Sequence, residues 1–368
     1  MAKAPKNVYV VLLAGGTGTR LWPSSRKKNP KQFAKLFSRY TLFQETIRRV
    51  RGLVPLSHVF IITNKVHVEA IRKQEPMIPK ANIIAEPEKK NTAMAMGVAA
   101  AYVHKKDPNA IIINLATDHL IRKLNIYHNA LKTAAKVAND QNAIVSIGIQ
   151  PTFPHTGYGY IKAGLKLTQL NSLPVYKVDS FVEKPDLKTA QKYIKTGKYY
   201  WNANNYVWPA KLILEEFKKL APKIYKCIDE IYQVIGTNKE KGALVKQFSL
   251  APSESIDYAI SEKTKKLIIV PGKFIWDDIG GWKVIHDLSQ KDKNGNSVIV
   301  HNGKGGHISI DTKNTLIQTE DQLIATVGIN NLAIIDTKDA LLICDLSKSQ
   351  NVKKLVEILK EKKLTQYL

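Results

Sequence analysis

The sequence has little cysteine and no long apolar run. Only Cys227 and Cys344 occur in 368 residues, and they lie far apart in the chain. Two widely spaced thiols favour a reducing compartment over a disulfide-rich secreted class of protein, with one disulfide between them as the alternative. No apolar stretch reaches the roughly eighteen residues of a membrane span, and Met1–Asn7 has no secretory signal pattern. We therefore expect a cytoplasmic protein without a membrane partner.

Acidic residues are also few. The chain has 31 Asp and Glu residues against 56 Lys and Arg residues, which gives a net charge of +25. Such an excess raises nucleic-acid or anionic-membrane binding as an alternative function. The lysines are scattered in pairs such as Lys27-Lys28 and Lys218-Lys219, however, and form no basic arm or aromatic-studded basic strand. We interpret the charge as a bias of the surface and expect no nucleic-acid partner.

A glycine-rich loop near the N-terminus lacks the features of two common nucleotide-binding motifs. Residues 13–33 read LAGGTGTRLWPSSRKKNPKQF after the apolar run Val8–Leu12. No Lys-Ser or Lys-Thr pair follows the glycines at P-loop spacing. Leu21 stands where a dinucleotide-binding fingerprint has its third glycine, and residues 38–40 lack the acidic residue expected there. Both a P-loop and a nicotinamide site are therefore excluded.

The loop does contain what phosphate binding requires. Gly15, Gly16 and Gly18 let the backbone turn sharply and bring its N–H groups close to an anion. Arg20 adds a forked cation and Lys31 a mobile one. A glycine-rich turn without a ligand is the alternative. We predict that this loop binds the phosphates of a nucleotide, and the candidate residues are Leu13, Ala14, Gly15, Gly16 and Gly18.

Apolar runs alternate with helix-like segments in the first half of the chain. Strands separated by about ten to fifteen helical residues imply parallel crossovers, and so an α/β fold with a doubly wound, mostly parallel sheet. Such a sheet binds ligands beyond the carboxyl ends of its strands, where the glycine loop, Glu86 and Asp118 fall. The expected strands are Val8–Leu13, His58–Thr63, Asn82–Ala85, Ala110–Ala116 and Ala143–Gly148.

A different pattern follows the polar stretch 292–296. Short β-rich pieces succeed one another from residue 297 to residue 344 with almost no helix between them, and a helix is expected at Val352–Lys362. Short, even spacing predicts a small all-β unit. Either a β-roll or a short left-handed β-helix satisfies this pattern. We therefore expect one domain over residues 1–291 and a β-rich domain with a terminal helix over residues 297–368.

The glycine loop also carries family-specific details. Its segments Leu21-Trp22-Pro23 and Pro30-Lys31-Gln32-Phe33 resemble the signature of the sugar-nucleotidyltransferase family, and within it the mannose-1-phosphate guanylyltransferase branch. The resemblance implies transfer of GMP from GTP to α-D-mannose 1-phosphate, with GDP-mannose and pyrophosphate as products. It also implies that residues 1–291 form the catalytic domain, with Arg20 and Lys31 as catalytic residues acting on the phosphates.

Two aspartates match the positions of the family's metal ligands. Asp118 follows a strand expected to be buried, and Asp278 directly precedes an Ile-Gly step. The resemblance thus implies Mg²⁺ as the cofactor, which suits a transfer between two anions because their repulsion must be cancelled. A loop or N-cap role is the alternative for each aspartate. Asp277 has the same chemistry as its neighbour Asp278 and is easily confused with it.

The segment Glu86–Ala93 resembles the part of the family that lies beside the nucleobase. Glu86, Asn91 and Thr92 are therefore expected to bind the nucleotide. For Asn91 and Thr92, a cap on the following helix is an equal alternative. Met94 stands where the family commonly has proline, so the preference for guanine rests on the resemblance to the branch.

Gly159, Glu183, Lys184 and Asn202 match the sugar-phosphate side of the family. A glycine permits close approach of a sugar ring, a glutamate accepts hydrogen bonds from hydroxyls, and a lysine pairs with a phosphate. An ordinary exposed ion pair on a hairpin is the alternative. Residues 201–206 read WNANNY where the family typically has Trp-Asn-Ser-Gly-Met-Phe, so Asn202 is retained but its neighbours differ.

Because residues 203–206 differ from the family pattern, another hexose or heptose 1-phosphate, or another nucleotide, is an alternative substrate for the same chemistry. A catalytically silent regulatory or binding protein on this scaffold is the alternative of a different class. Free strand edges in the β-rich tail also leave a homodimer open. An enzyme is favoured because the charged candidate residues are all retained, namely Arg20, Lys31, Asp118, Glu183, Lys184 and Asp278.

Overall fold

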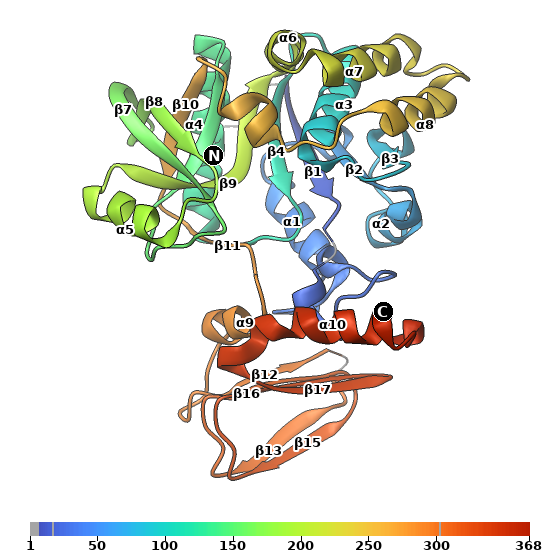
Figure 1. Ribbon diagram of the computed structural model, residues 1–368, viewed down its shortest axis with the longest axis vertical. Coiled ribbons are helices and arrows are strands. Elements are labelled where there is room, and N and C mark those ends of the chain that lie inside the picture. The colour runs from blue at the N-terminus through green and yellow to red at the C-terminus, as the bar shows by residue number, and fades with distance from the viewer. Residues whose placement is uncertain (1–6, 17, 302) are drawn as a thin grey trace. The chain divides into compact units, whose positions relative to one another are not determined.

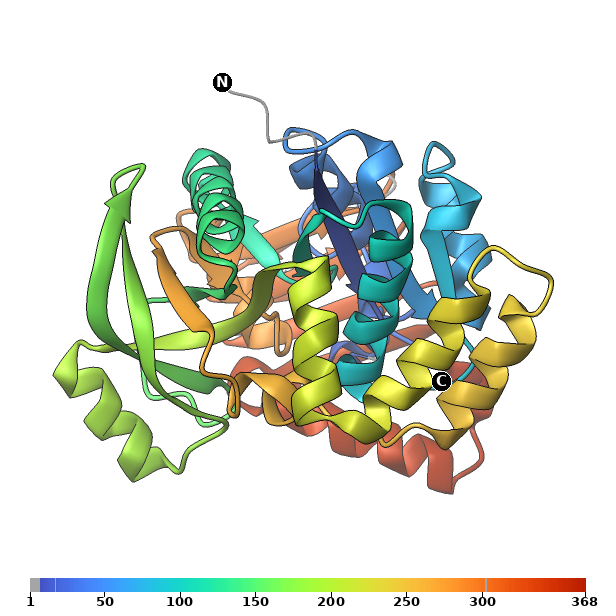
Figure 2. The same cartoon turned by 90° about the horizontal axis from the view of Figure 1, so that it is seen from above.

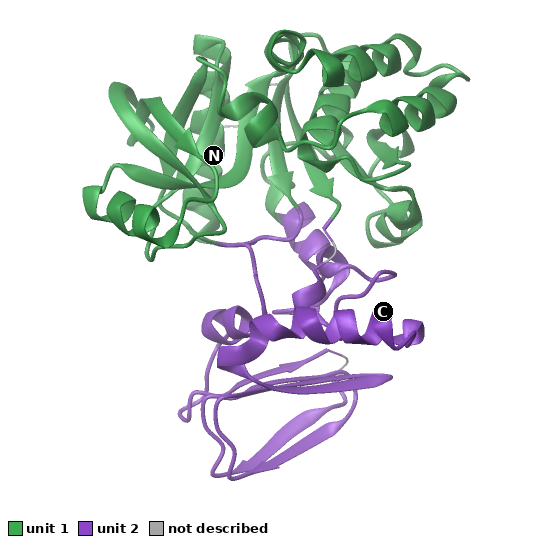
Figure 3. Ribbon diagram, in the orientation of Figure 1, with its two compact units in different colours: residues 1–15, 49–116, 121–276 green, residues 16–48, 117–120, 277–368 purple. Residues whose placement is uncertain are grey.

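The computed structural model describes residues 7–16, 18–301 and 303–368, so Thr17 of the glycine loop lies outside the described part. The chain divides into two compact units, each built from segments that are distant in the sequence (Figure 3). The first unit takes residues 1–15, 49–116 and 121–276. The second takes residues 16–48, 117–120 and 277–368. No single cut in the sequence separates the two units.

The first unit is built on a nine-stranded mixed sheet with the order β3-β2-β1-β4-β9-β6-β10-β8-β7 (Figure 1). Four neighbouring strands are parallel: β1 (Val8–Ala14), β2 (Val59–Asn64), β3 (Ile83–Glu86) and β4 (Ile111–Ala116). The mostly parallel α/β sheet expected for the first half of the chain is thereby confirmed.

The other half of the sheet contains the antiparallel strands. β6 (Ile144–Ile149) and β10 (Leu267–Gly272) are parallel to each other, and β9 (Tyr199–Pro209) lies antiparallel between β4 and β6. The hairpin of β7 (Gly159–Leu170) and β8 (Leu173–Val182) adds the far edge. Strand β6 was expected from the sequence, whereas β9 and β10 were not.

Helices cover both faces of this sheet, because its central strands are apolar on both sides. Strand β1 reads VYVVLLA, and Val10, Val11 and Leu12 are fully buried. Helix α3 (Asn91–Lys106) packs on β1, β2 and β4. Helix α4 (Leu124–Gln141) packs on β4, β6, β9 and β10 from the opposite face (Figure 2).

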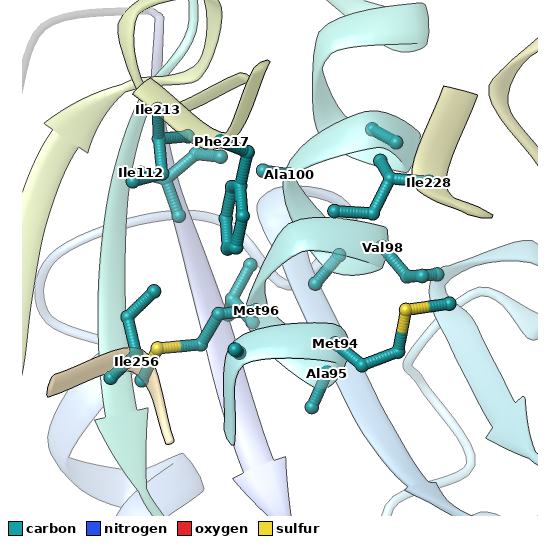
Figure 4. Close-up of a cluster of buried hydrophobic side chains, with 14 of the residues drawn as sticks. Met94, Ala95, Met96, Val98, Ala100, Ile112, Ile213, Phe217, Ile228 and Ile256 are labelled. Atoms are coloured by element: carbon teal, nitrogen blue, oxygen red, sulfur yellow. The ribbon is translucent and has the colours of Figure 1, made fainter. Parts of the chain in front are cut away.

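Helix α3 is the centre of the apolar core of the first unit. Every residue from Ala93 to Val103 is buried, which a run rich in alanine allows. Gly97 lies where α3 meets α7 (Pro222–Val234), and a Cβ there would stand 2.2 Å from Cδ1 of Ile228. Figure 4 shows Ile228 and Phe217 of α6 (Ala210–Leu220) beside this helix. Glycine thus permits the close approach of α3 and α7.

The helical segment over residues 210–234 is divided into α6 and α7 at Ala221. Pro222 is the first residue of α7, where a missing N–H costs no helical hydrogen bond.

None of the helices in the described part of the chain is long and apolar enough to cross a membrane. Further elements of the chain are α1 (Leu42–Val50), α2 (Val68–Gln74), β5 (Leu120–Arg122), α5 (Leu187–Thr196), α8 (Glu240–Leu250), a π-helical turn η6 (Asp257–Ser261) and β11 (Ile275–Asp277).

The second unit contains the β-rich segment. β12 (Ser297–Val300), β14 (Leu316–Thr319) and β16 (Leu332–Thr337) pair in parallel, and β17 (Ala340–Asp345) joins β16 antiparallel. β13 (Gly306–Ile310) and β15 (Leu323–Val327) form a second parallel pair. Because successive strands alternate between two parallel sheets, the coil of the chain is that of a short β-helix.

One apolar core joins the glycine-loop segment to this β-rich segment inside the second unit. Trp22 and Trp282, at the start of α9 (Trp282–Leu288), both belong to it, and Trp282 Nε1 donates to the main-chain oxygen of Trp22 at 3.0 Å. Trp22 Nε1 donates to the main-chain oxygen of Tyr367 at 2.7 Å, beyond α10 (Val352–Glu361). Arg26 makes a two-pronged contact with the carboxylate of Asp339 at 2.7 and 2.6 Å. The loop that carries the phosphate-binding pattern is therefore held by the C-terminal segment.

Candidate functional site

A pocket of about 310 Å³ lies in the second unit. Four segments that are distant in the sequence contribute to it: the glycine loop, the turn after β4, the stretch after β11, and helix α10. Four predicted charged residues thus come together, two of them cationic and two acidic. The pocket is lined by Gly18, Thr19, Arg20, Leu21, Lys31, Asp118, Asp278, Ile279, Gly280 and Lys353.

Lys31 is the central cation of this pocket. It begins the 3₁₀ turn Lys31–Phe33, and only 7% of the residue is exposed. Its Nζ lies 3.0 Å from Oδ2 of Asp118 and also donates to the main-chain oxygen of Asp278. One buried ammonium therefore ties together the two loops that carry the candidate metal ligands.

Asp118 is held in its charged form. Burial alone would raise the pKa of its carboxyl, but the charges of Lys31 and His119 and the hydrogen bond from Lys31 outweigh burial and lower that pKa. About 25% of the Asp118 side chain is exposed, so the carboxylate is not closed off from a ligand. An ionised, partly accessible carboxylate is what a hard cation such as Mg²⁺ requires.

The structure separates the roles of Asp277 and Asp278. Oδ1 of Asp277 accepts the N–H of Ile279 at 2.6 Å, and Ile279 has a φ of 50° although it is β-branched and buried. Burial raises the pKa of Asp277 to about 6; the bond from Ile279 opposes this shift, and the charge of Asp278 adds to it. Asp277 thus stabilises the turn by accepting the N–H of Ile279, while Asp278 lines the pocket. The sequence alone could not distinguish the two aspartates.

Gly18 must be glycine for this arrangement. Its φ is +58°, and a Cβ would stand 2.4 Å from Cβ of Lys31 and 2.9 Å from Oγ of Ser25. Gly16 faces the same place, because a Cβ there would lie 3.3 Å from Oδ2 of Asp118. The glycines of the loop therefore leave room for Lys31 and Asp118 to reach the pocket.

Arg20 presents an uncommitted positive charge. The residue is exposed, and its guanidinium makes no hydrogen bond or ion pair with the residues that the structure describes. Lys353 of α10 adds a further cation to the lining, and it pairs only loosely with Glu357, at 3.9 Å. Sequence reasoning missed Lys353, because a lysine in an amphipathic terminal helix resembles ordinary surface. The balance of cations over carboxylates suits a phosphate-rich ligand.

The donor set fits a metal that is shared with a substrate. Mg²⁺ is commonly bound by one or two carboxylates, with phosphate oxygens and water completing its shell. Asp118 and Asp278 supply two carboxylates on one pocket. No cluster of three or more His, Cys, Asp or Glu side chains placed to hold a metal occurs in the described ranges. The pocket therefore suits Mg²⁺ bound together with phosphates, not a metal enclosed by protein ligands alone.

The first unit holds the other nucleotide-site candidates at the carboxyl ends of β1 and β3. Oγ1 of Thr63 donates to the main-chain oxygen of Ala14 at 2.8 Å, which fixes the end of β1 next to Leu13. A Cβ on Gly15 would lie 3.9 Å from Oε2 of Glu86, so these two residues are neighbours. Burial raises the pKa of Glu86 to about 7, partly opposed by the charge of Lys89.

Asn91 and Thr92 begin α3, and the structure shows what their side chains contact. Asn91 has a φ of 64°, and its Oδ1 accepts the N–H of Thr92 at 2.8 Å. Oγ1 of Thr92 accepts the N–H of Ile256 at 2.9 Å. Asn91 thus satisfies a first-turn N–H group itself, and Thr92 holds the segment that leads into η6. The hydroxyl oxygen of Thr92 therefore accepts a structural hydrogen bond, and its O–H can still donate to a ligand.

The sugar-side candidates also meet in the first unit. Gly159 pairs with Asn202 across β7 and β9, and a Cβ on Gly159 would stand 2.4 Å from Oε2 of Glu183. Nζ of Lys184 lies 2.8 Å from Oε1 of Glu183. The bond to Glu183 raises the pKa of Lys184, while burial opposes the shift. Glycine, carboxylate, ammonium and amide are thus adjacent in the folded chain.

Asp257 joins this group and was missed by sequence reasoning. Its Oδ1 accepts from Nδ2 of Asn202 and from the hydroxyl of Tyr206, both at 2.8 Å. Burial raises its pKa to about 6; the bonds from Tyr206 and Asn202 oppose the shift, and the charge of Glu183 adds to it. An aspartate in an irregular stretch between α8 and β10 gives no signal that could have identified it.

Two models of known protein families match successive parts of the chain. Residues 9–295 match the model of the nucleotidyl transferase family. Residues 305–359 match the model described as a MannoseP isomerase/GMP-like beta-helix domain. Of the two architectures expected for the tail, the β-helix is therefore the one that is supported.

Individual relatives agree with these matches. The chain is 39% identical to mannose-1-phosphate guanylyltransferase 2 of Escherichia coli O157:H7, over 100% of this chain and 76% of that protein. It is 37% identical to a mannose-1-phosphate guanylyltransferase of Klebsiella pneumoniae, over 97% and 75% of the two chains. A crystal structure from Thermus thermophilus, described as a mannose-1-phosphate geranyltransferase, superposes with a TM-score of 0.84 at 28% identity and covers 96% of this chain and 99% of its own. The chain therefore belongs to the nucleotidyl transferase family of enzymes, as a relative of the mannose-1-phosphate guanylyltransferases.

Proposed function

We propose that this enzyme transfers GMP from GTP to α-D-mannose 1-phosphate, giving GDP-mannose and pyrophosphate. The observation that carries the proposal is the convergence of Arg20, Lys31, Asp118 and Asp278 on one pocket. The relatives that cover nearly the whole chain carry names for this reaction. Such a transfer needs two anions held in line with their charges neutralised, and the pocket offers both cations and carboxylates.

The reaction needs no covalent enzyme intermediate. A phosphate oxygen of mannose 1-phosphate attacks the α-phosphorus of GTP, and the bond from that phosphorus to the bridging oxygen of the β-phosphate breaks. The bridging oxygen leaves with the electron pair as part of pyrophosphate. Arg20, whose guanidinium is free among the described residues, binds the β- and γ-phosphates and stabilises the charge of the leaving group.

Lys31 acts on the same phosphates, and its charge keeps Asp118 ionised at neutral pH. Asp118 and Asp278 would hold Mg²⁺, which when bound neutralises phosphate charge and polarises the reacting phosphorus–oxygen bonds. Asp277 keeps Asp278 directed to the pocket through its bond to Ile279. The protein thereby orients the two carboxylates before substrate arrives.

The first unit supplies recognition of the other substrate groups. Leu13, Ala14, Gly15 and Glu86 bind the nucleotide at the carboxyl ends of the strands, with Asn91 and Thr92 at the start of α3. The position of Glu86 beside Gly15 supports this assignment.

The sugar phosphate is bound by Gly159, Glu183, Lys184 and Asn202. Their adjacency within the first unit supports the assignment, because Gly159 leaves the space that Glu183 occupies. Glu183 accepts hydrogen bonds from the sugar hydroxyls, and Lys184 pairs with the phosphate.

A different hexose or heptose 1-phosphate is the second candidate substrate, and Asn204 favours it. Asn204 has a φ of 55°, and its buried Oδ1 accepts no hydrogen bond from a described residue. This side chain stands where the family typically has glycine. A buried acceptor beside Asn202 would contact a hydroxyl that a glycine leaves alone.

Pyrophosphate release tests the proposal. The purified protein is mixed with GTP, Mg²⁺ and one sugar 1-phosphate from a panel of hexoses and heptoses, and then with ATP, UTP or dTTP in place of GTP. We expect turnover with GTP and mannose 1-phosphate that chelation of Mg²⁺ abolishes and added Mg²⁺ restores. No turnover with any pair would contradict the enzyme function, and turnover only with another sugar or nucleotide would correct the substrate.

The same proposal covers the organisation of the protein. We infer a catalytic domain over residues 1–291 and a β-helical domain over residues 297–368, acting in the cytoplasm without nucleic acid or membrane. A homodimer through the strand edges of the β-rich segment is tested by light scattering of the purified protein.

A further inference from the structure

Asp257 is a buried carboxylate to which the proposed reaction assigns no role. We propose that Asp257 is a positioning residue that orients the amide of Asn202 for recognition of the sugar. The inference rests on the proposed function, since it concerns the sugar 1-phosphate side of that reaction. It adds a residue that is not among the candidate site residues named from the sequence.

Asp257 holds one end of the Asn202 amide. Oδ1 of Asp257 accepts from Nδ2 of Asn202 at 2.8 Å. The other end of the amide is also engaged, because Oδ1 of Asn202 accepts the main-chain N–H of Asn204 at 3.1 Å. An amide with its nitrogen bound to a carboxylate and its oxygen bound to an N–H has one orientation, since a flip would break both contacts. Oδ1 of Asn202 also accepts from the hydroxyl of Ser146 at 3.5 Å, so one N–H of Asn202 remains for a ligand.

Tyr206 holds Asp257 in turn. The hydroxyl of Tyr206 donates to the same Oδ1 at 2.8 Å, and both Tyr206 and Asp257 are buried. Asp257 also begins the π-helical turn η6, a rare form of backbone that is frequent at functional sites. The carboxylate is therefore fixed from two sides and cannot follow the amide if the amide moves.

The oriented amide lies at the sugar-side group. Asn202 pairs with Gly159 across β7 and β9, and Gly159 leaves the space that Oε2 of Glu183 occupies. The charges of Glu183 and Lys184 both interact with Asp257. A shift of the Asn202 amide would therefore change the place where Glu183 and Lys184 meet the sugar phosphate. Asp257 and Asn202 do not belong to the lining of the pocket of Arg20 and Lys31.

The experiment separates KM for the sugar 1-phosphate from KM for GTP in two variants of one residue. Asp257→Ala removes the acceptor for Asn202 and Tyr206, and we expect KM for the sugar 1-phosphate to rise about tenfold or more while KM for GTP stays within about twofold. Asp257→Asn keeps an oxygen at the Oδ1 position. We expect it to rescue the loss, with KM for the sugar 1-phosphate within about threefold of wild type.

Glu216→Ala is the matched control. Glu216 is also a buried carboxylate of the first unit, and its Oε2 accepts from the hydroxyl of Thr264, just beyond η6. It has no contact with the sugar-side group among the described residues. Glu216→Ala therefore reports the general cost of losing a buried carboxylate near this segment, and we expect both KM values to stay near wild type. Circular dichroism and thermal unfolding check that all three variants fold.

The outcomes distinguish this inference from the proposed function. The wild type is assayed first with the sugar panel, and the sugar 1-phosphate that it uses is taken for the variants. A wild type that uses none overturns the proposed function and this inference with it. If the wild type is active, three results overturn this inference alone. Asp257→Ala leaves KM for the sugar 1-phosphate unchanged, it raises both KM values equally, or Asp257→Asn does not reverse the rise. If Asp257→Ala does not fold, Asp257→Asn and Tyr206→Phe are assayed in its place. A rise in KM for the sugar 1-phosphate alone with Tyr206→Phe supports positioning by Asp257. An unchanged KM for the sugar 1-phosphate overturns it.

Discussion

The ammonium of Lys31 lies 3.0 Å from the carboxylate of Asp118, and only 7% of Lys31 is exposed. A buried ion pair of this kind is costly to break on one side, because the remaining charge has no partner. The pair also keeps the pKa of Asp118 low, so that it is ready to bind a cation at neutral pH. Position and protonation of the candidate metal ligand therefore both depend on one lysine.

Replacement of Lys31 by alanine should remove both effects. We expect kcat/KM to fall by about 100-fold or more, because one preorganised cation at the phosphates is lost. We also expect the Mg²⁺ concentration needed for half-maximal activity to rise, since protons then compete with the metal for Asp118. Lys28→Ala, an exposed lysine of the same loop, is the control and should change neither quantity. Equal activities of the two variants would exclude the assigned role of Lys31.

Arg20→Ala should separate activity from stability. The guanidinium of Arg20 contacts none of the described residues by hydrogen bond or ion pair, so its loss should leave the melting temperature unchanged within about 1 °C. Turnover should fall by about 100-fold or more, because the charge on the leaving pyrophosphate loses its stabilising partner. Steady-state kinetics with thermal unfolding measures both. Activity within a few-fold of wild type would show that Arg20 does not contact the phosphates.

Gly97→Ala should destabilise the first unit. The new Cβ would stand 2.2 Å from Cδ1 of Ile228 and 3.2 Å from the ring of Phe217, so the buried Ile228 side chain would have to leave its rotamer or helices α3 and α7 would have to separate. We expect a loss of about 1–3 kcal/mol in the free energy of unfolding, measured by denaturant titration. Gly242→Ala is the matched control, because Gly242 lies inside α8 with nothing within 4 Å of its added Cβ. That variant should gain up to about 1 kcal/mol, since alanine favours a helix. A gain in both variants would contradict the packing of α3 against α7.

Gly159→Ala should affect sugar binding more than stability. Its Cβ would meet Oε2 of Glu183 at 2.4 Å, and the end of a flexible side chain can move aside at little cost to the fold. Glu183 would then leave its position, so KM for the sugar 1-phosphate should rise about tenfold while KM for GTP is retained. Initial-rate kinetics with each substrate varied in turn measures the two constants. Wild-type KM for the sugar would show that Glu183 does not need this space.

The stability of the protein should fall with rising pH because of Glu86. Burial raises the pKa of Glu86 to about 7 from an ordinary value of 4.5. Between these values the native protein holds a proton that the unfolded chain has lost, so the free energy of unfolding decreases as pH increases. Glu86→Gln removes this term, and its advantage over wild type should be about 3 kcal/mol larger near pH 8 than near pH 4.

Denaturant titrations of wild type and Glu86→Gln at the two pH values test this sign and size. Glu88→Gln, an exposed neighbour, is the control and should show no such difference. An advantage of Glu86→Gln that does not change with pH would mean that Glu86 has the same pKa in the native protein and in the unfolded chain.

Much of the fold follows from local pattern. Strands such as β1 and β4 are short apolar runs buried on both faces, and their spacing sets the parallel order. Strand β9 escaped prediction because it reads YYWNANNYVWP, and the asparagines in its middle break the apolar pattern. One of these asparagines, Asn202, donates to Asp257, and this contact between residues distant in the sequence forms only in the folded chain.

The candidate site was predictable where the chemistry is carried by contiguous motifs. Lys31, Asp118 and Asp278 could be named because each stands in a recognisable segment, and the structure brings them to one pocket. Lys353 and Asp257 could not, because an isolated lysine on a terminal helix or an aspartate in an irregular stretch has no local signature. Only the packing of distant segments gives these two residues a place beside the others.

The bond from Trp22 to the main-chain oxygen of Tyr367 spans 345 positions of the chain. Domains generally fold as units while they are synthesised, with N-terminal parts first. Strands β1 to β4 can pair early, but the loop that follows β1 must wait for Tyr367 and for Asp339, the partner of Arg26. The glycine loop therefore takes its final form only after Tyr367 has been synthesised, although the strand that precedes the loop is among the first parts of the chain to be made.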